Sequence, residues 1–205
     1  MPELPTLETF ARRPRDALMW VPRSTDVARI DAALRVAGAR VVDVGAGTGL
    51  LAHLLDASIL AIDPAPAAVR YHPVVPGEAA TLAGPFDAIV VSWMEAGKDY
   101  REACARLAPV IVNAYDVEGG CGVMGQVDFA PFGFVEAASW RTPSFEDAAH
   151  ALDHRGALQR KGHPGNRIDV LTREPRLVEP LRAAVASAQQ RPPLAWEAEM
   201  DARGM

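Results

Sequence analysis

The chain has 205 residues, of which 49% are hydrophobic and 23% charged, and its formal net charge is −5 at pH 7. This length is ordinarily one domain with a buried core, and the composition is typical of a soluble globular protein. The acidic balance argues against a large polyanionic partner, so nucleic acid is not expected. No apolar run approaches the roughly 20 residues that span a membrane.

Cysteine and histidine usage predicts neither a disulfide framework nor a metal site. Cys104 and Cys121 have no zinc-like spacing. His150 and His154 lie four residues apart on a predicted helix, as metal-binding pairs do, but no carboxylate completes a site. The N-terminus shows no secretory pattern, so we expect a cytoplasmic protein.

The first part of the chain predicts one helix after an extended segment. Residues 1–23 are rich in proline and arginine and suggest an extended lead-in with a single helical turn. Ser24 can cap a helix whose apolar residues recur at helical spacing, and Gly38 ends it.

The central part predicts strands alternating with helices. A helical stripe from Tyr100 to Leu107 separates two of the strands. Strand alternating with helix indicates a parallel, doubly wound sheet. The expected strands are 41–44, 58–62, a short one within 72–79, 86–93 and 109–114.

The last third is less regular. Ser144 and Asp147 form a capping-box pattern that opens a helix. Late strands are expected at 134–135 and 168–172, and Pro180 suits the first turn of a closing helix. The tail from residue 192 lacks periodicity, although Trp196 could anchor it.

Residues 41–50 carry the most informative motif. An apolar strand containing Asp43 runs into a loop with Gly45, Gly47 and Gly49, and leucines then begin a helix. Such a turn brings a nucleotide-like ligand against bare backbone. A dinucleotide fingerprint, G-x-G-x-x-G, would need glycine where Leu50 stands. The pattern here is D-x-G-x-G-x-G, in which the acid suits a cationic amino-acid moiety.

This stretch resembles the first motif of class I S-adenosylmethionine-dependent methyltransferases. The resemblance covers residues 24–116, and Phe86-Asp87 before an apolar strand resembles the family's fourth motif. It implies a Rossmann-like, mostly parallel sheet of about seven strands with an antiparallel edge hairpin. We accordingly divide a single domain into a lead-in at 1–23, a cofactor-binding core at 24–116, a substrate-side part at 117–191 and a tail at 192–205.

The resemblance also implies which residues bind S-adenosylmethionine. Asp63 closes the second strand about twenty residues after the glycine loop begins, the spacing at which an acid takes both ribose hydroxyls. Glu78 and Ala79 stand where the family usually has Asp-Ala at the adenine, so glutamate is a departure. Ser92 emerges at the end of the fourth strand. A loop-bracing Asp43, a turn at Asp63 and a solvated Glu78 are the structural alternatives.

Candidate substrate-side residues are Trp93, Glu95, Tyr115 and Asp116, all expected at strand ends. No catalytic residue is identified, because methyl transfer from a sulfonium can depend mainly on positioning. The glycine-rich stretch 118–122 suggests an active-site lid. The signatures of DNA-amino and cytosine-C5 methyltransferases are both missing after residue 91.

The predicted function is methyl transfer to a small molecule. One alternative is methylation of a protein or RNA, which the basic segment 154–161 would favour. Another is a non-catalytic domain that only binds the cofactor or mediates interactions. A nicotinamide oxidoreductase is the weakest reading, given Leu50. The sequence leaves the acceptor and the oligomeric state open.

Overall fold

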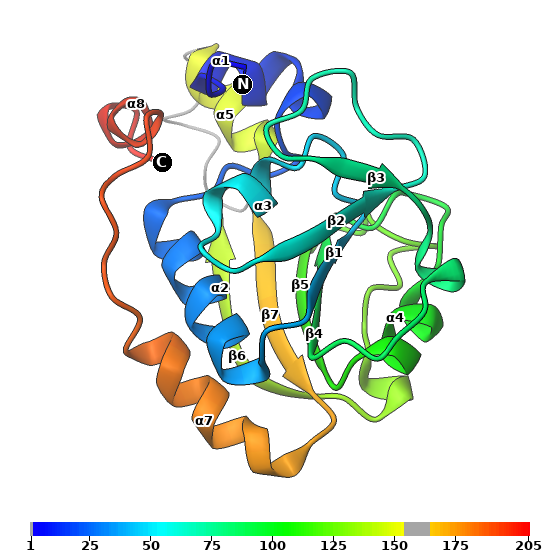
Figure 1. Cartoon of the computed structure of the whole chain (residues 1–205). Coiled ribbons are helices and arrows are strands. Elements are labelled where there is room, and N and C mark those ends of the chain that lie inside the picture. Colours follow the sequence, from blue (N-terminus) through cyan, green and yellow to red (C-terminus); the bar gives the residue numbers. More distant parts are fainter. Residues whose placement is uncertain (1, 154–164) are drawn as a thin grey trace.

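The computed structural model describes residues 2–153 and 165–205, and these residues build one seven-stranded sheet in the order β3-β2-β1-β4-β5-β7-β6 (Figure 1). The strands are β1 Val41–Val44, β2 Ile59–Asp63, β3 Val74–Pro76, β4 Ala88–Ser92, β5 Val110–Asp116, β6 Val135–Thr142 and β7 Asn166–Thr172. The α-helices are α1 Leu7–Arg12, α2 Ser24–Ala37, α3 Leu50–Leu54, α4 Arg101–Leu107, α5 Phe145–Leu152, α7 Pro175–Ala186 and α8 Glu197–Ala202. Short 3-10 helices are η1 Pro14–Asp16, η2 Ala79–Thr81 and η3 Ala130–Phe132.

The sheet is mostly parallel. The pairs among β1 to β5 are parallel, whereas β7 runs antiparallel to both β5 and β6. The predicted fold class is therefore confirmed, including the antiparallel edge. Because β5 extends through Asp116, Tyr115 and Asp116 are its last residues and not the start of a loop.

Two apolar layers enclose the sheet. Side chains alternate between the faces of a strand, so Val41, Val90 and Val112 face one cluster while Val42 and Ile89 face the other. The first cluster includes residues of α2, α3 and α7, and the second includes α4 (Figure 1). Burial on both faces explains why the central strands are continuous apolar runs.

The start of α2 differs from the prediction. Ser24 is the first residue of the helix, and Arg23 is its N-cap. The Arg23 backbone N–H donates to the Asp26 carboxylate, while the Ser24 N–H and hydroxyl donate to Glu197 near the C-terminus. Local sequence could not show that the capping group comes from 173 residues away.

The closing helix also begins earlier than predicted. α7 starts at Pro175, so Pro180 lies inside the helix instead of in its first turn. Pro175 occupies the position at which a missing N–H costs nothing. Leu181 and Val185 are buried, as their spacing predicted. The capping box at Ser144 is confirmed, because its hydroxyl accepts from the Asp147 N–H.

Both ends of the chain pack against the domain. Leu7 and Phe10 of α1 are fully buried, and Trp196 before α8 is 1% exposed. The anchoring role predicted for Trp196 is confirmed. The chain divisions at residues 23, 116 and 191 remain a prediction. None of the helices in residues 2–153 and 165–205 is long and apolar enough to cross a membrane.

Candidate functional site

The glycine loop lies at the carboxyl edge of the sheet, between β1 and α3. Gly45, Gly47 and Gly49 have φ angles of 74°, 53° and 69°, a region that favours glycine. A Cβ on Gly49 would lie 2.9 Å from the Cβ of His72 and 3.0 Å from a methyl of Val74. The loop therefore depends on glycine both for its conformation and for its packing against the β2–β3 segment.

Replacing Gly49 by alanine should destabilise the fold. The substitution combines left-handed backbone strain of about 1 kcal/mol with overpacking that typically costs about 1–3 kcal/mol. We expect a lower midpoint in urea denaturation at an unchanged slope. Gly133→Ala is the matched control, because its φ is 81° but a Cβ there meets nothing within 4 Å. Equal losses for both variants would contradict the packing argument.

Asp63 links the end of β2 to the glycine loop. Its Oδ2 accepts from the Gly47 N–H at 2.9 Å, and its Oδ1 accepts from the Ala65 N–H at 2.8 Å. The carboxylate thus lies directly beside the loop that the sequence singled out. It can present acceptor oxygens to two adjacent hydroxyls of a ligand resting on that loop.

Asp43 is buried within β1 and has no hydrogen-bond partner in the described part of the chain. The residue is 1% exposed, and both carboxylate oxygens lack a donor. Burial, reinforced by the nearby Asp63 carboxylate, raises the pKa of Asp43 to about 7. A buried acceptor without a hydrogen bond lowers the stability of the fold, and a bound ligand that donates to it would remove this cost. Asp43 therefore does not brace the loop through a hydrogen bond, and it retains its full capacity to accept.

The remaining predicted cofactor residues have different surroundings. Glu78 is exposed and is the N-cap residue of η2, while Ala79 is buried in the second cluster. Ser92 is 6% exposed, and its hydroxyl accepts from the indole N–H of Trp20 at 2.9 Å. That bond ties the end of β4 to the N-terminal segment.

Tyr100 is a site residue that sequence reasoning missed. Its hydroxyl lies so close to Gly45 that a Cβ there would be 3.1 Å from the oxygen. Burial raises the pKa of Tyr100, and the thiol of Cys104 and the carboxyl of Asp43 add to the effect. The sequence placed Tyr100 on an apolar helical stripe. An aromatic hydroxyl just before α4 was the signal that could have identified it.

The N-terminal segment 13–23, which we call the strap, crosses the same edge. The Thr48 hydroxyl in the glycine loop donates to the Ala17 carbonyl at 2.6 Å. The Tyr71 hydroxyl donates to the Asp16 carbonyl at 3.1 Å. The predicted lead-in is therefore part of the site, which its proline and arginine content did not reveal.

Trp93 and Glu95 follow β4. Trp93 has a left-handed φ of 68°, its N–H donates to the Ala114 carbonyl, and its ring meets Phe145 edge-on at 6.0 Å. A non-glycine residue in this conformation is strained, and such strain is concentrated at functional sites. Glu95 is exposed. The structure thus puts Trp93 between β5 and α5.

Tyr115 and Asp116 do not share one pocket. The Tyr115 hydroxyl donates to Asp169 at 2.9 Å, and Tyr115 lines a separate groove of about 480 Å³ with Arg167 and Asp169. Burial raises the pKa of Tyr115, and the neighbouring Asp169 carboxylate adds to the effect. Asp116 accepts from the Glu118 and Gly120 N–H groups. Both side chains are thus engaged within the protein.

The glycine-rich stretch packs beside the end of β4. The Gly122 N–H donates to the Met94 carbonyl, and the Gly97 N–H donates to the Gly122 carbonyl. Burial raises the pKa of the Cys121 thiol to about 12, which makes it a poor nucleophile at neutral pH. A lid function for this stretch remains a prediction.

His150 and His154 are the histidine pair with the spacing of a helical metal site. Among the described residues, no group of three His, Cys, Asp or Glu side chains could hold a metal ion. His150 lies on α5, whereas His154 and the basic segment 154–161 lie outside the described residues.

Comparisons with known proteins identify the fold. No protein-family model matches the chain, and no curated protein matches its sequence. Magnesium protoporphyrin IX methyltransferase from Synechocystis PCC 6803 with bound SAM is 16% identical over 85% of this chain and 86% of that chain, with a TM-score of 0.50. The same enzyme with bound SAH gives 15% identity, 85% and 90% coverage and a TM-score of 0.50.

The match extends over most of both chains, and the seven-stranded sheet with its antiparallel edge is the one that the first-motif resemblance implied. At this level of identity the comparison concerns the architecture. The chain has the Rossmann-like fold of class I S-adenosylmethionine-dependent methyltransferases.

Proposed function

We propose that this protein transfers a methyl group from S-adenosylmethionine to a small-molecule acceptor. The observation that carries the proposal is Asp43, a buried carboxylate beside the glycine loop with no donor among the described residues. A cationic ammonium group has three N–H donors that could bind the Asp43 carboxylate, and its charge would offset the free-energy cost of burying that carboxylate. S-adenosylmethionine carries such a group at one end. Near its other end it has a ribose diol, whose two hydroxyls would donate hydrogen bonds to Asp63.

The described residues would bind and orient the cofactor. The backbone of Gly45, Gly47 and Gly49 allows close approach, and the Ala79 N–H would reach the adenine ring, with Glu78 beside it. When bound, the cofactor supplies a methyl group on a positively charged sulfur.

The protein's task is to hold an acceptor in line with that methyl and to exclude water. Trp93 would provide a flat surface for the acceptor, with Glu95 two residues after it and Asp116 two residues after Ala114, whose carbonyl accepts from the Trp93 N–H.

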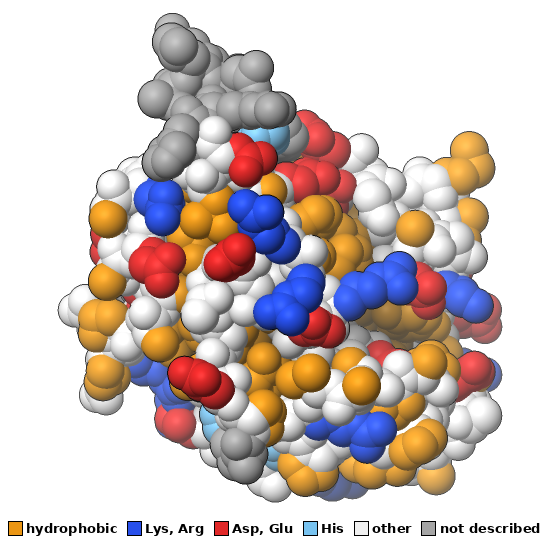
Figure 2. Space-filling view, turned by 90° about the horizontal axis from the view of Figure 1, so that it is seen from above, with side chains coloured by type: hydrophobic (Ala, Val, Ile, Leu, Met, Phe, Trp, Pro, Cys, Tyr) orange, Lys and Arg blue, Asp and Glu red, His pale blue; other side chains and the backbone are white. Residues whose placement is uncertain are grey.

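A small acceptor is favoured over a macromolecule by the strap. Its hydrogen bonds to Thr48, Tyr71 and Ser92 close the carboxyl edge over the proposed cofactor pocket. Figure 2 views the molecule from above, and among the described residues it shows positive and negative side chains interspersed on that face. Such a surface does not favour a polyanion.

Titration calorimetry tests the function. We expect the folded protein to bind S-adenosylmethionine and its demethylated product S-adenosylhomocysteine with dissociation constants in the micromolar range. Absence of heat with either compound would refute the proposal. Incubating radiolabelled donor with cell extract then separates the alternatives, because label entering protein or RNA would favour a macromolecular acceptor. Binding without label transfer to any fraction would favour a non-catalytic domain.

A further inference from the structure

The strap closes the proposed cofactor pocket through contacts at several points along its length. Asp16 and Ala17 offer their carbonyls to side chains of the site, and Trp20 donates to Ser92. Thr48, whose hydroxyl donates to the strap, is 2% exposed, and Asp43 in the preceding strand β1 is 1% exposed. With the cofactor beside the glycine loop, as proposed, the strap would border the bound ligand, and it is held there by a few hydrogen bonds, each of modest net strength.

Trp196 contacts the strap and the helix before it. The indole N–H donates to the Pro22 carbonyl at 2.7 Å, at the end of the strap. The ring meets Phe10 of α1 edge-on, with 5.0 Å between the ring centroids. One side chain from the C-terminal tail thus joins Pro22 at the end of the strap to α1, the helix that precedes the strap, and it is buried while doing so.

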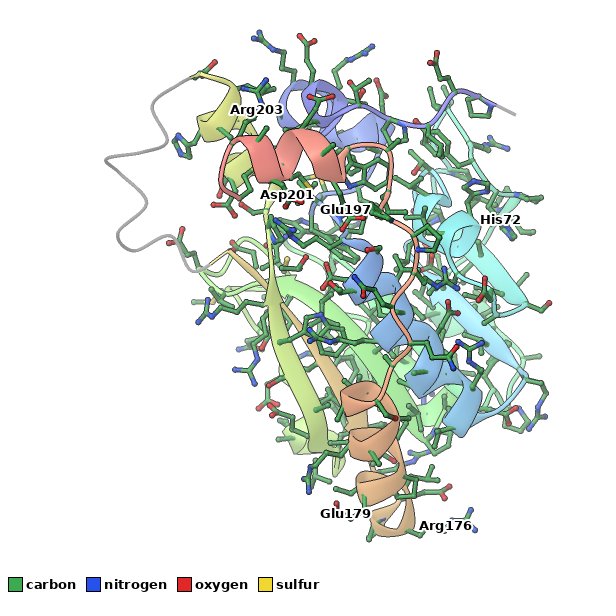
Figure 3. All side chains as sticks on the ribbon, turned by 90° about the vertical axis from the view of Figure 1, so that its left-hand side faces the viewer. His72, Arg176, Glu179, Glu197, Asp201 and Arg203 are labelled. Carbon is green, nitrogen blue, oxygen red and sulfur yellow. The ribbon has the colours of Figure 1, made fainter. Side chains whose placement is uncertain are left out.

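Glu197 fixes the point where the strap continues into α2. Its Oε1 accepts from the Ser24 N–H at 3.0 Å and from the Ser24 hydroxyl at 3.1 Å. Glu197 is only 7% exposed. Arg23 adds an ion pair with Asp201 at 3.0 Å and donates to the Met205 carbonyl. Figure 3 shows Glu197 and Asp201 on α8, beside the upper end of α2.

We propose that α8 is a latch for the strap. Trp196 and Glu197 are positioning residues that hold the strap closed, so the C-terminal helix sets how fast the cofactor enters and leaves. This inference rests on the proposed function, since it concerns the same pocket. Neither residue contacts the glycine loop in the hydrogen bonds and ring contacts given above, so both act through the strap.

The test measures the dissociation rate of radiolabelled S-adenosylhomocysteine after addition of excess unlabelled compound. Trp196→Phe keeps a ring against Phe10 but removes the bond to Pro22, and Glu197→Gln keeps the size but removes the charge. Each should raise the dissociation rate about two- to tenfold, the range expected for one lost hydrogen bond. In both variants, trypsin should cleave after Arg15, in the strap, faster than in the wild type, while the cleavage rates at sites outside the strap stay the same.

Glu179→Gln is the matched control. Glu179 lies on α7, its side chain is 77% exposed, and it pairs only locally with Arg182. Figure 3 shows it at the end of α7 far from α8. The control should leave both the dissociation rate and the cleavage after Arg15 unchanged. If Trp196→Phe and Glu197→Gln both release the ligand at the wild-type rate, as the control does, the latch is refuted.

Tyr71→Phe loosens the strap from its other side, because it removes the bond to the Asp16 carbonyl while keeping the ring. It should also accelerate release. Faster release from Tyr71→Phe alone, with the α8 variants unchanged, would show that the strap gates the pocket without α8 and would overturn the latch. If Trp196→Phe fails to fold, Asp201→Asn replaces it. Asp201 is exposed, and its substitution weakens the ion pair with Arg23. Failure of the wild type to bind would instead refute the proposed function.

Discussion

The Asp63→Ala protein is expected to bind S-adenosylmethionine at least about a hundredfold more weakly than wild type. A hydrogen bond to a charged group contributes about 1.5–3 kcal/mol, and the carboxylate would accept from two ribose hydroxyls. Loss of both corresponds to about 3–6 kcal/mol. The loop also loses the anchor at the Gly47 N–H, which lies 2.9 Å from the carboxylate. Titration calorimetry with the donor and with S-adenosylhomocysteine measures the change.

Asp87→Ala is the control for this variant. Asp87 precedes β4 at the opposite edge of the sheet, where it accepts from the Arg40 N–H at 2.9 Å and from its guanidinium at 2.8 Å. Removing it deletes a carboxylate of the same kind far from the glycine loop. Its affinity for the cofactor should stay within about twofold of wild type, as is usual for a surface change. Affinity of Asp63→Ala within threefold of wild type would remove Asp63 from the site.

The second expected result is a contribution of Asp43 to the pH dependence of folding stability, which Asp43→Asn removes. The pKa of Asp43 rises on folding from 3.8 to about 7. Between these values the folded state binds more protons than the unfolded state, so the free energy of unfolding falls as pH rises. The loss over the whole titration is about 4 kcal/mol, at 1.36 kcal/mol for each pKa unit. This contribution to the slope is halved at the folded pKa and vanishes only well above it.

Urea denaturation of both proteins at intervals between pH 4 and pH 8 tests this result. The difference between the two curves isolates Asp43, because the other titrating groups are common to both. Asp87→Asn serves for comparison, since the Arg40 guanidinium lowers the pKa of Asp87. A carboxylate with a lowered pKa stabilises the fold at pH values above its unfolded pKa, and this stabilisation is lost as pH falls. The slope that Asp87 contributes therefore has the opposite sign to that of Asp43. Parallel curves for wild type and Asp43→Asn would show that Asp43 is not desolvated.

Cofactor binding should flatten the wild-type pH dependence. An ammonium group beside the Asp43 carboxylate favours the ionised form and lowers its pKa. Saturating S-adenosylhomocysteine should therefore stabilise the wild type more at pH 7 than at pH 4. The gain at pH 7 should be smaller for Asp43→Asn, since an uncharged amide offers no charge pairing. An equal gain for both proteins would place the ammonium group elsewhere.

Local patterns were sufficient for much of the fold. Buried parallel strands read as apolar runs such as 88–91, and the glycine loop is identified by the left-handed conformation that its residues adopt. These features depend on neighbours in sequence. The start of α2 and the position of Pro180 were mispredicted for the opposite reason. Glu197 replaces the expected cap of α2, and α7 gains a turn before Pro180.

The sequence by itself determined the class of fold, the glycine loop and the pair of acids, because the carboxyl ends of parallel strands lie at one edge of the sheet. Only the tertiary structure decided that Asp43 has no donor among residues 2–153 and 165–205, that Tyr100 lies beside Gly45, and that the N-terminal strap contacts the glycine loop. It also separated Tyr115 from the proposed pocket and joined Trp196 to Pro22. These facts rest on contacts between residues far apart in the chain, which no local periodicity or spacing encodes.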